Sequence, residues 1–502
     1  MSANGNSSEK AKLRAELWHK LLHLPGQLFM TAMQKAGQWL HGVPAVPLTI
    51  PRHELNRLRR RLQSIQASYG AGQPAADRPI RAEDHQVIAQ IRRATAQANL
   101  NNVTRTAAYY DVYKRHPELH WALLAHTVSR NSGWNMTDLK GELLPRLLTA
   151  ADTEALFAML EKANALIFQD AYPQLLLYAE SRRTGRSLFH LLPQFHVSRF
   201  MEPVWDRFWI TGCSPLVTVS LIINEQHYIE QRVIQQPEVR RDVLDAWFFQ
   251  TQSLLQLNQV VFPYECRQST LPRLAGIVVD RFESLKERIE IGKALYAMLF
   301  GLPQVLQGVQ RFAAAQPHTG SRADVWPQLF TRSGSTRSTG DVSQPGVYRS
   351  PSASRPDLRS SVRSEPAAGK ADTAVVSHRL AAPNSARGAA GNMKRSGSVR
   401  SGATTASPSK ADPDADAGEY RDERLLGSCR LRPGAAPLYS PELTAAWPNR
   451  PLPPVERFDW CSDLSAFAYL NSPELPDSYE MTSEYCYSLQ AIELAVIGKK
   501  LL

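Results

Sequence analysis

A long stretch poor in apolar residues divides this chain and limits its possible folds more than any other feature. Residues 313–433 are rich in Ser, Ala, Arg, Gly and Pro and carry few large apolar side chains. Such a stretch cannot bury enough apolar surface to offset the entropy lost when its backbone is ordered. We therefore predict a disordered basic linker over 313–433. Its Arg-Ser tracts leave weak nucleic-acid binding open, but we favour a solvated linker.

The sequence before the linker has the apolar spacing of helices. Apolar side chains recur at steps of three and four residues over 55–65, and similar spacing covers 156–167. The pattern continues over 277–289, where Ile277, Val278 and Phe282 precede Ile289. This period places the apolar side chains on one face of a helix. We predict a mainly α protein with a multi-helix globular core.

Local signals place some helix ends. Thr149 and Asp152 have the spacing of a capping box, with Asp in place of Glu, at the start of a helix. Pro237 suits the first turn of another helix. Residues 216–223 are sufficiently β-branched to form a strand, but no partner strand is evident.

The segment after the linker returns to aromatic and aliphatic residues. A final helix is predicted over 483–501, with Leu489, Ile492 and Val496 on one face. A segment of this size is small for an independent core. Closing a loop as long as the linker costs about 4 kcal/mol, and burial of one or two aromatic side chains offsets that at about 25 cal/mol per Å². We therefore expect this segment to dock back on the helical core. The four predicted parts are an N-terminal helical region at 1–98, a core at 99–312, the linker at 313–433 and a C-terminal segment at 434–502.

Charge and cysteine content bound the setting of the protein. The net charge is +11 and the isoelectric point about 9.4, a balance that favours anionic partners. Because many of the arginines lie in the linker, this preference is general rather than site-specific. The 5 cysteines are scattered and none form a Cys-x-x-Cys pair, so structural zinc and a disulfide framework are both unexpected. The N-terminus lacks the pattern of a signal peptide, and we expect a cytoplasmic protein.

The N-terminal residues 10–40 carry an amphipathic pattern. Leu13, Leu17 and Trp18 lie on an apolar stripe that Lys10 and Lys20 flank. Such a segment suits an anionic membrane surface at the inner face of the cell membrane, or a protein partner. Packing on the helical core is the alternative that we favour.

Residues 99–146 are dense in polar side chains that can do chemistry. His120 and His126 are six residues apart, so on a helix they point about 120° away from each other and cannot share one metal ion. His126 with Arg130 could bind an anion, and His120 beside Asn131 could act in acid–base chemistry. We favour packing histidines in a polar-seamed bundle.

Two further groups extend this candidate site. Asp138 and Lys140 sit where a loop is predicted to enter a short helix that Asn135 or Thr137 caps. His190, His196 and Arg199 echo the histidine spacing of the first group, and we favour chance over a repeat as the explanation. A pocket built from 116–140 and 190–199 would support a hydrolase or transferase. The candidate residues are His120, His126, Arg130, Asn131, Asp138, His196 and Arg199.

Known cofactor and metal motifs give little further support for an enzyme. The chain has no Walker loop, no Gly-x-Gly-x-x-Gly, no Gly-x-Ser-x-Gly and no His-Glu-x-x-His. A calcium-loop-like run at 412–423 has Ala417 where the loop needs glycine, and Pro413 at its second position. We predict no cofactor and no metal.

Several segments resemble one family of bacterial proteins. They are 102–106 (Asn-Val-Thr-Arg-Thr), 120–126, 129–131, 133–141, 170–178, 196–198 and 222–226, followed near the C-terminus by 439–441, 446–447 and 459–460. In these segments the chain resembles the DUF2515 family of uncharacterised proteins, and the long basic linker looks like an insertion in the family's layout. The resemblance implies an intracellular, Gram-positive bacterial setting. It implies no reaction, ligand or catalytic residue.

Together these features favour a soluble, mainly helical protein of unknown biochemical activity, more an interaction or structural protein than an enzyme. The first alternative is a small-molecule hydrolase or transferase with the pocket from 116–140 and 190–199. The second is a protein attached peripherally to the inner membrane through residues 10–40.

Overall fold

The computed structural model describes residues 44–70, 80–245, 258–266, 269, 271–333, 424–426, 429–452 and 458–501. All of these belong to one compact unit, and a second unit, Thr336–Glu419, lies outside the described residues. The amphipathic segment 10–40, the calcium-like run 412–423 and residues 334–423 of the predicted linker also lie outside them.

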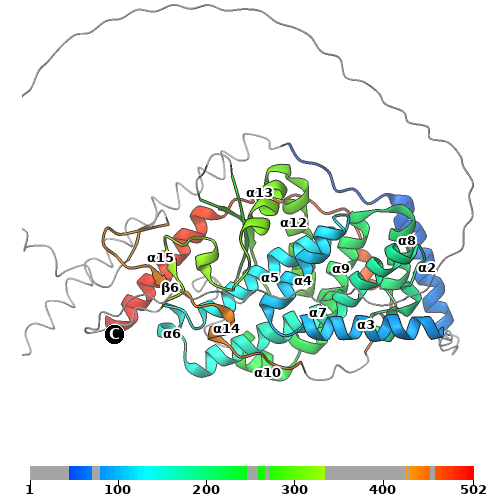
Figure 1. The fold of residues 1–502 in the computed structure, drawn as a ribbon, viewed down its shortest axis with the longest axis horizontal. Coiled ribbons are helices and arrows are strands. Elements are labelled where there is room, and N and C mark those ends of the chain that lie inside the picture. The colour runs from blue at the N-terminus through cyan, green and yellow to red at the C-terminus, as the bar shows by residue number, and fades with distance from the viewer. Residues whose placement is uncertain are drawn as a thin grey trace, which may run out of the picture. The chain divides into compact units, whose positions relative to one another are not determined.

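The prediction of a mainly α fold is confirmed (Figure 1). The strands form small two-stranded sheets, in which β1 pairs with β2, β3 with β6 and β4 with β5. The longer helices are α2 (Arg52–Gly70), α3 (Ala82–Ala98), α4 (Asn102–Arg115), α5 (His120–Asp138), α7 (Ala150–Thr184), α8 (Met201–Thr211), α9 (Ser214–Ile229), α12 (Leu285–Gly301), α13 (Pro303–Ala315) and α15 (Thr482–Leu501). The short helices and strands are α6 (Leu144–Leu147), α10 (Pro237–Val239), α14 (Leu443–Ala446), β1 (Gln259–Tyr264), β2 (Arg273–Val278), β3 (Phe330–Thr331), β4 (Leu425–Leu426), β5 (Arg430–Leu431) and β6 (Leu438–Tyr439).

Helix α5 lies at the centre of the bundle, in contact with α4, α7, α9 and α12. Its close approach to neighbouring side chains depends on Gly133. A Cβ at that position would come 2.3 Å from Asn102 Oδ1 and 2.5 Å from His318 Nε2. A glycine therefore lets a buried polar cluster sit directly against the α5 backbone.

Helix α7 begins and ends as local sequence chemistry dictates. The Thr149 hydroxyl accepts from the Asp152 backbone N–H, and the Asp152 side chain accepts from the Thr149 N–H, so the predicted capping box is confirmed. The helix ends at Gly185, whose φ of 70° is left-handed. Pro237 also occupies the first turn of α10 as expected.

Residues 216–223, whose composition would also suit a strand, lie within α9, because this helix is buried on nearly all sides and its apolar run is continuous. One local prediction was wrong. Ile277 and Val278 belong to β2, which pairs antiparallel with β1, and not to the helix that begins at Leu285.

The C-terminal segment docks back on the helical bundle, as predicted. Trp447 stacks on Phe157 of α7 with ring centroids 3.8 Å apart, and its indole N–H donates to the Met136 carbonyl at 2.8 Å. Farther along, the Trp460 indole N–H donates to Asn224 at 2.9 Å. The final helix is confirmed as α15.

The folded unit extends into both ends of the predicted linker, so its boundaries at 313 and 433 were wrong. Helix α13 continues to Ala315, and a 3-10 turn covers Arg322–Asp324. β3 then pairs in parallel with β6, which joins Phe330 to Leu438. The buried side chains of Trp326, Leu329 and Leu425 are the apolar residues that anchor these ends.

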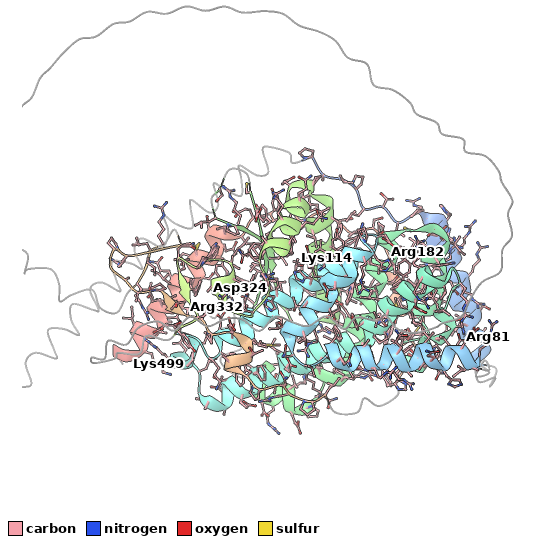
Figure 2. The ribbon with its side chains drawn as sticks, viewed as in Figure 1. Arg81, Lys114, Arg182, Asp324, Arg332 and Lys499 are labelled. Carbon is pink, nitrogen blue, oxygen red and sulfur yellow. A yellow bond between two sulfur atoms is a disulfide. The ribbon has the colours of Figure 1, made fainter. Side chains whose placement is uncertain are left out.

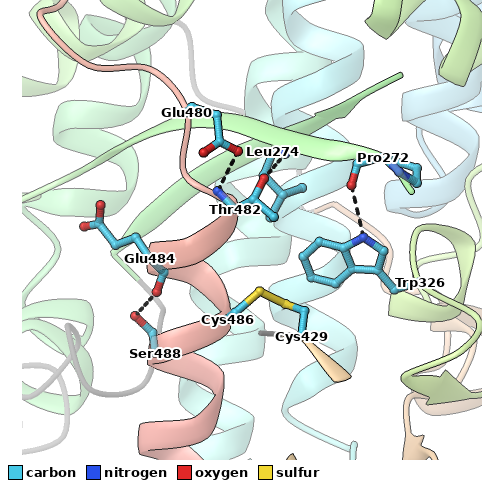
Figure 3. Close-up of a disulfide and its surroundings, with 9 residues drawn as sticks. All are labelled: Pro272, Leu274, Trp326, Cys429, Glu480, Thr482, Glu484, Cys486 and Ser488. Atoms are coloured by element: carbon cyan, nitrogen blue, oxygen red, sulfur yellow. Dashed lines mark hydrogen bonds between the residues drawn. A yellow bond between two sulfur atoms is a disulfide. The ribbon is translucent and has the colours of Figure 1, made fainter. Parts of the chain in front are cut away.

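A single disulfide joins Cys429, beside β5, to Cys486 in α15, although the scattered cysteines gave no reason to expect one (Figure 3). Their separation of 57 residues leaves no local motif in the sequence. Among the described residues Cys213, Cys266 and Cys461 are free thiols.

Among the described helices no single one is long and apolar enough to cross a membrane. The pair α12 and α13, bent by 89°, passes the same test on length and composition only.

Candidate functional site

Most of the candidate residues lie on α5, but each contacts a different partner. His120 Nδ1 lies 2.9 Å from the Tyr296 hydroxyl, and its ring stacks on Phe300 with centroids 3.9 Å apart. Burial lowers the pKa of His120 to about 4, which leaves a neutral imidazole near pH 7. His120 thus sits in the interface between α5 and α12.

His126 and Arg130 lie close together, and each contacts a backbone carbonyl rather than the other's side chain. His126 Nδ1 lies 2.9 Å from the Thr106 carbonyl, and burial, together with the nearby Arg130, lowers the pKa of His126 to about 3. Arg130 donates to the Gln316 carbonyl at 2.7 Å and lies over the Phe312 ring. The guanidinium fixes the chain that follows α13 rather than facing a ligand.

Asn131 and Asp138 also serve contacts between elements. The Asn131 amide accepts from the Val261 N–H at 3.2 Å and donates to the Gln259 carbonyl at 3.3 Å, which ties α5 to β1. Asp138 forms a 2.6 Å ion pair with Arg322. The predicted helix start at Asn135 or Thr137 was wrong, because α5 runs through both to Asp138.

The second candidate group lies on other elements. His196 has a left-handed φ of 62° where a 3-10 helix ends. Arg199 pairs with Asp459 at 2.6 Å, and the Ser198 hydroxyl donates to the same carboxylate at 2.6 Å. Asp459 lies in the C-terminal segment, so this group anchors that segment. The polar contacts of the two candidate groups therefore lead to separate partners and not to one shared site.

A buried polar cluster beside His126 was missed from sequence. His318 Nε2 lies 2.9 Å from Asn102 Oδ1, and the Asn102 amide donates to the Ser129 carbonyl at 2.9 Å. Asp324 Oδ2 lies 3.9 Å from His318 Nδ1. Asn102 and Ser129 belong to segments that resemble the family, which was the available signal. His318 and Asp324 lay in the predicted linker and gave none.

A second missed pair consists of buried carboxyl groups on α7 and α9. Asp170 accepts from Gln174 at 2.9 Å and from Asn224 at 2.5 Å. Glu225 accepts from the Trp121 indole N–H at 3.1 Å. Burial raises the pKa of Asp170 to about 7 and that of Glu225 to about 8. The negative charge of Asp170 adds to the rise in the pKa of Glu225, and both groups make this part of the core sensitive to pH.

An open surface groove is the feature best placed to bind another molecule. It has a volume of about 720 Å³ and lies between α3, the end of α4 and α7. Arg182 in the last turn of α7 is labelled in Figure 2, as is Lys114 in the last turn of α4. The residues that line the groove are Val87, Gln90, Ile91, Ala94, Arg115, His116, Glu118, Leu176, Ala179, Glu180, Arg182 and Arg183.

A second, much smaller cavity of about 30 Å³ is lined by the Asp138–Arg322 pair and Tyr485. Arg322 lies over the rings of Trp134 and Tyr485 at 5.3 and 5.2 Å, which holds it rigidly. A space of this size suits about one water molecule and no larger ligand. In the described part of the chain, no group of three or more His, Cys, Asp or Glu side chains could hold a metal ion.

Comparison with known proteins gives a family but no activity. The model of the DUF2515 family, described as a protein of unknown function, matches residues 97–357. The uncharacterized protein YppC of Bacillus subtilis (strain 168) is 44% identical over 239 residues, which is 48% of this chain and 73% of that protein. No solved structure matches the chain. Because the family model covers just over half of the sequence, the chain belongs to the DUF2515 family.

Proposed function

We propose that this protein is a non-catalytic interaction protein that recognises its partner through the groove between α3, α4 and α7. The proposal rests on one observation: the polar candidate residues of the sequence do not line the groove. The candidate residues of α5 bind Tyr296, Thr106 and other internal groups, whereas the lining of the groove includes none of them.

The chemistry of the groove supports recognition rather than a reaction. His116 and Glu118 come from the stretch that the enzyme hypothesis used, and both line the groove. Yet the Glu118 carboxylate accepts from the Tyr178 hydroxyl at 2.8 Å, and His116 Nδ1 lies 3.6 Å from the same carboxylate. Both side chains thus have internal partners, and the lining offers no serine or cysteine nucleophile.

A photo-reactive amino acid placed at Gln90 tests this proposal in the full chain, expressed in a Bacillus host. Gln90 is exposed on α3 and lines the groove. We expect one discrete protein adduct from this position. Ala179→Trp, which fills the groove from α7, should abolish the adduct without changing the melting temperature.

The matched control places the same cross-linker at Arg60, which is exposed on α2 and away from the groove. No adduct of the same mass should form there. Equal labelling at both positions, or labelling that Ala179→Trp leaves intact, would show that the groove is not the recognition surface.

A further inference from the structure

The two walls of the groove have the same helical spacing. On α3 the lining residues are Val87, Gln90, Ile91 and Ala94, and on α7 they include Leu176, Ala179, Glu180 and Arg183. Both sets follow steps of three, four and seven residues, so each wall is a single helix face about two turns, or about 10 Å, long.

Apolar and polar side chains share the lining of the groove, and the apolar ones lie on both walls. Val87, Ile91 and Ala94 face the groove from α3, and Leu176 and Ala179 face it from α7. A groove with apolar side chains can receive the apolar face of an amphipathic helix. The short side chains Ala94 and Ala179 leave the depth that the apolar side chains of such a helix need.

The charges at one end of the groove are unequal. Arg183 forms hydrogen bonds with Glu180 at 2.8 and 2.5 Å, and these lower the pKa of Glu180, so that this pair is neutral overall. Arg115 donates to the Asp111 carbonyl of its own helix. Within the described residues, neither Arg115 nor Arg182 has a carboxylate within ion-pair distance.

The electrostatics of the helix ends explains part of why these arginines lie where they do. They lie in the last turns of α4 and α7, where cations complement the negative helix ends. That effect explains why arginines occur there. The guanidinium groups of Arg115 and Arg182 lie beside the apolar side chains of the groove. Each can form a bidentate pair with a carboxylate of another molecule.

We propose that the groove receives an amphipathic, acidic helix of a partner protein. This inference rests on the proposed function and names the partner's chemistry. The partner's apolar side chains would lie on Ile91, Leu176 and the neighbouring alanines, and its carboxylates would bind Arg115 and Arg182. Charge complementarity sets the orientation, and the apolar side chains of the groove supply the hydrophobic part of the contact.

The test uses the purified full chain and two fluorescent synthetic helices. Both carry leucines on one face, and the other face carries glutamates in one peptide and lysines in its twin. Fluorescence anisotropy should show saturable binding of the glutamate peptide that weakens as salt rises. Binding should fall by at least about tenfold in the double variant Arg115→Glu, Arg182→Glu.

The matched control is Arg60→Glu, Arg61→Glu, which reverses two exposed arginines of α2. It has the same net charge as the groove variant, and its affinity should stay within about twofold of the parent. Ala179→Trp should abolish binding even though it leaves every charge in place. Circular dichroism melts establish that each variant is folded.

Several results would overturn the inference. These are equal binding of the lysine twin, no binding of either peptide, or equal losses in the groove variant and the α2 control. Vesicles with anionic lipid form a separate arm, and binding to them that the groove variant alone loses would assign the groove to lipid instead. If the Gln90 adduct persists while the glutamate peptide fails, the interaction function stands and the acidic partner is wrong. Loss of both overturns both.

Discussion

The molecule has two hydrophobic clusters that are assembled in different ways. The first surrounds the amino-terminal half of α5 and draws mainly on α4, α7, α8, α9 and α12. The second surrounds Trp134 and draws on segments far apart in sequence, including 325–330, 425–447 and 481–496. The first is mainly a bundle of helices that follow one another along the chain, and the returning segment adds only Cys461, Ala466 and Leu470 to its buried residues. The second is closed by chain that returns after the long central stretch.

This difference shows which contacts stabilise each of the two clusters. In the first cluster, helical period and continuous apolar runs suffice to bury side chains. In the second, single anchors such as Trp447, the Arg322 ion pair and the disulfide hold short segments that have little regular structure. Loss of one anchor should therefore cost more in the second cluster than loss of one polar contact in the first.

The largest expected effect is that of Trp447→Ala. Trp447 is buried between Phe157 and the Met136 carbonyl. Its removal leaves a cavity and should lower the free energy of unfolding by about 4 kcal/mol, measured by urea titration with tryptophan fluorescence. Phe458→Ala, at a side chain that is 41% exposed, is the control and should cost less than about 1 kcal/mol. Similar small losses in both variants would mean that the second cluster does not depend on its returning segment.

The next effect is that of breaking the disulfide with Cys486→Ser. The bond closes a loop of 57 residues, and its loss should lower stability by about 3 kcal/mol. A reductant should lower the melting temperature of the parent to that of Cys486→Ser and leave the variant unchanged. Cys213→Ser, at a free and partly exposed thiol, is the control. A parent that is insensitive to reductant would show that the bond adds nothing to the second cluster.

A pH dependence should distinguish the first cluster. The pKa of Asp170 is raised from 3.8 to about 7, and that of Glu225 from 4.5 to about 8. Between the unfolded and the native pKa of each group, the native state binds more protons than the unfolded state. The free energy of unfolding therefore falls as pH rises from about 4 to about 8. Asp170→Asn should remove roughly 2 kcal/mol of this decline between about pH 5 and pH 7. Chemical denaturation at several pH values measures it, and a slope equal to that of the parent would contradict the assignment.

The smallest effect is expected at His120. Replacement by Phe keeps the stacking on Phe300 and removes one hydrogen bond to Tyr296. The loss should be about 1 kcal/mol, and the Gln90 adduct should form as in the parent. Disappearance of that adduct in a folded variant would restore His120 as a functional residue.

The sequence predicted the parts of the fold that depend on local chemistry. The capping box at Thr149, the proline at the start of α10 and the helical period of α2 each reflect interactions within a few residues. The docking of the C-terminal segment could also be predicted, because aromatic residues in a segment too small to fold alone need a surface to cover them.

The sequence was not sufficient where distant partners decide the structure. The composition of the run at 216–223 left a strand possible, and burial on nearly all sides makes it a helix. Cys429 and Cys486 come together only because α15 packs beside the β4–β5 hairpin. Sequence found α5 as a polar helix but not the partners of its side chains. The Arg322 that pairs with Asp138 lay in a stretch judged unable to fold.

The groove, too, could not be predicted from the sequence. Its lining comes from three helices, and its Arg115 and Arg182 are unremarkable members of two helix ends. Only the packing of α3 along α7 brings their apolar faces beside these charges. No pattern within either helix predicts that meeting.

The parallel pairing of β3 with β6 defines a place in the chain where the sequence can change in length without changing the folded unit. Thr331 lies opposite Tyr439, and Leu425 and Cys429 are also fixed in the folded unit, so both ends of the stretch 336–419 are anchored there. Doubling the length of a flexible loop costs only about 0.6 kcal/mol, far less than any anchor of the second cluster. We therefore expect changes of length within 336–419 to alter the stability of the folded unit little. For the same reason a reporter or affinity domain inserted within 336–419 should leave the melting temperature of the helical unit unchanged.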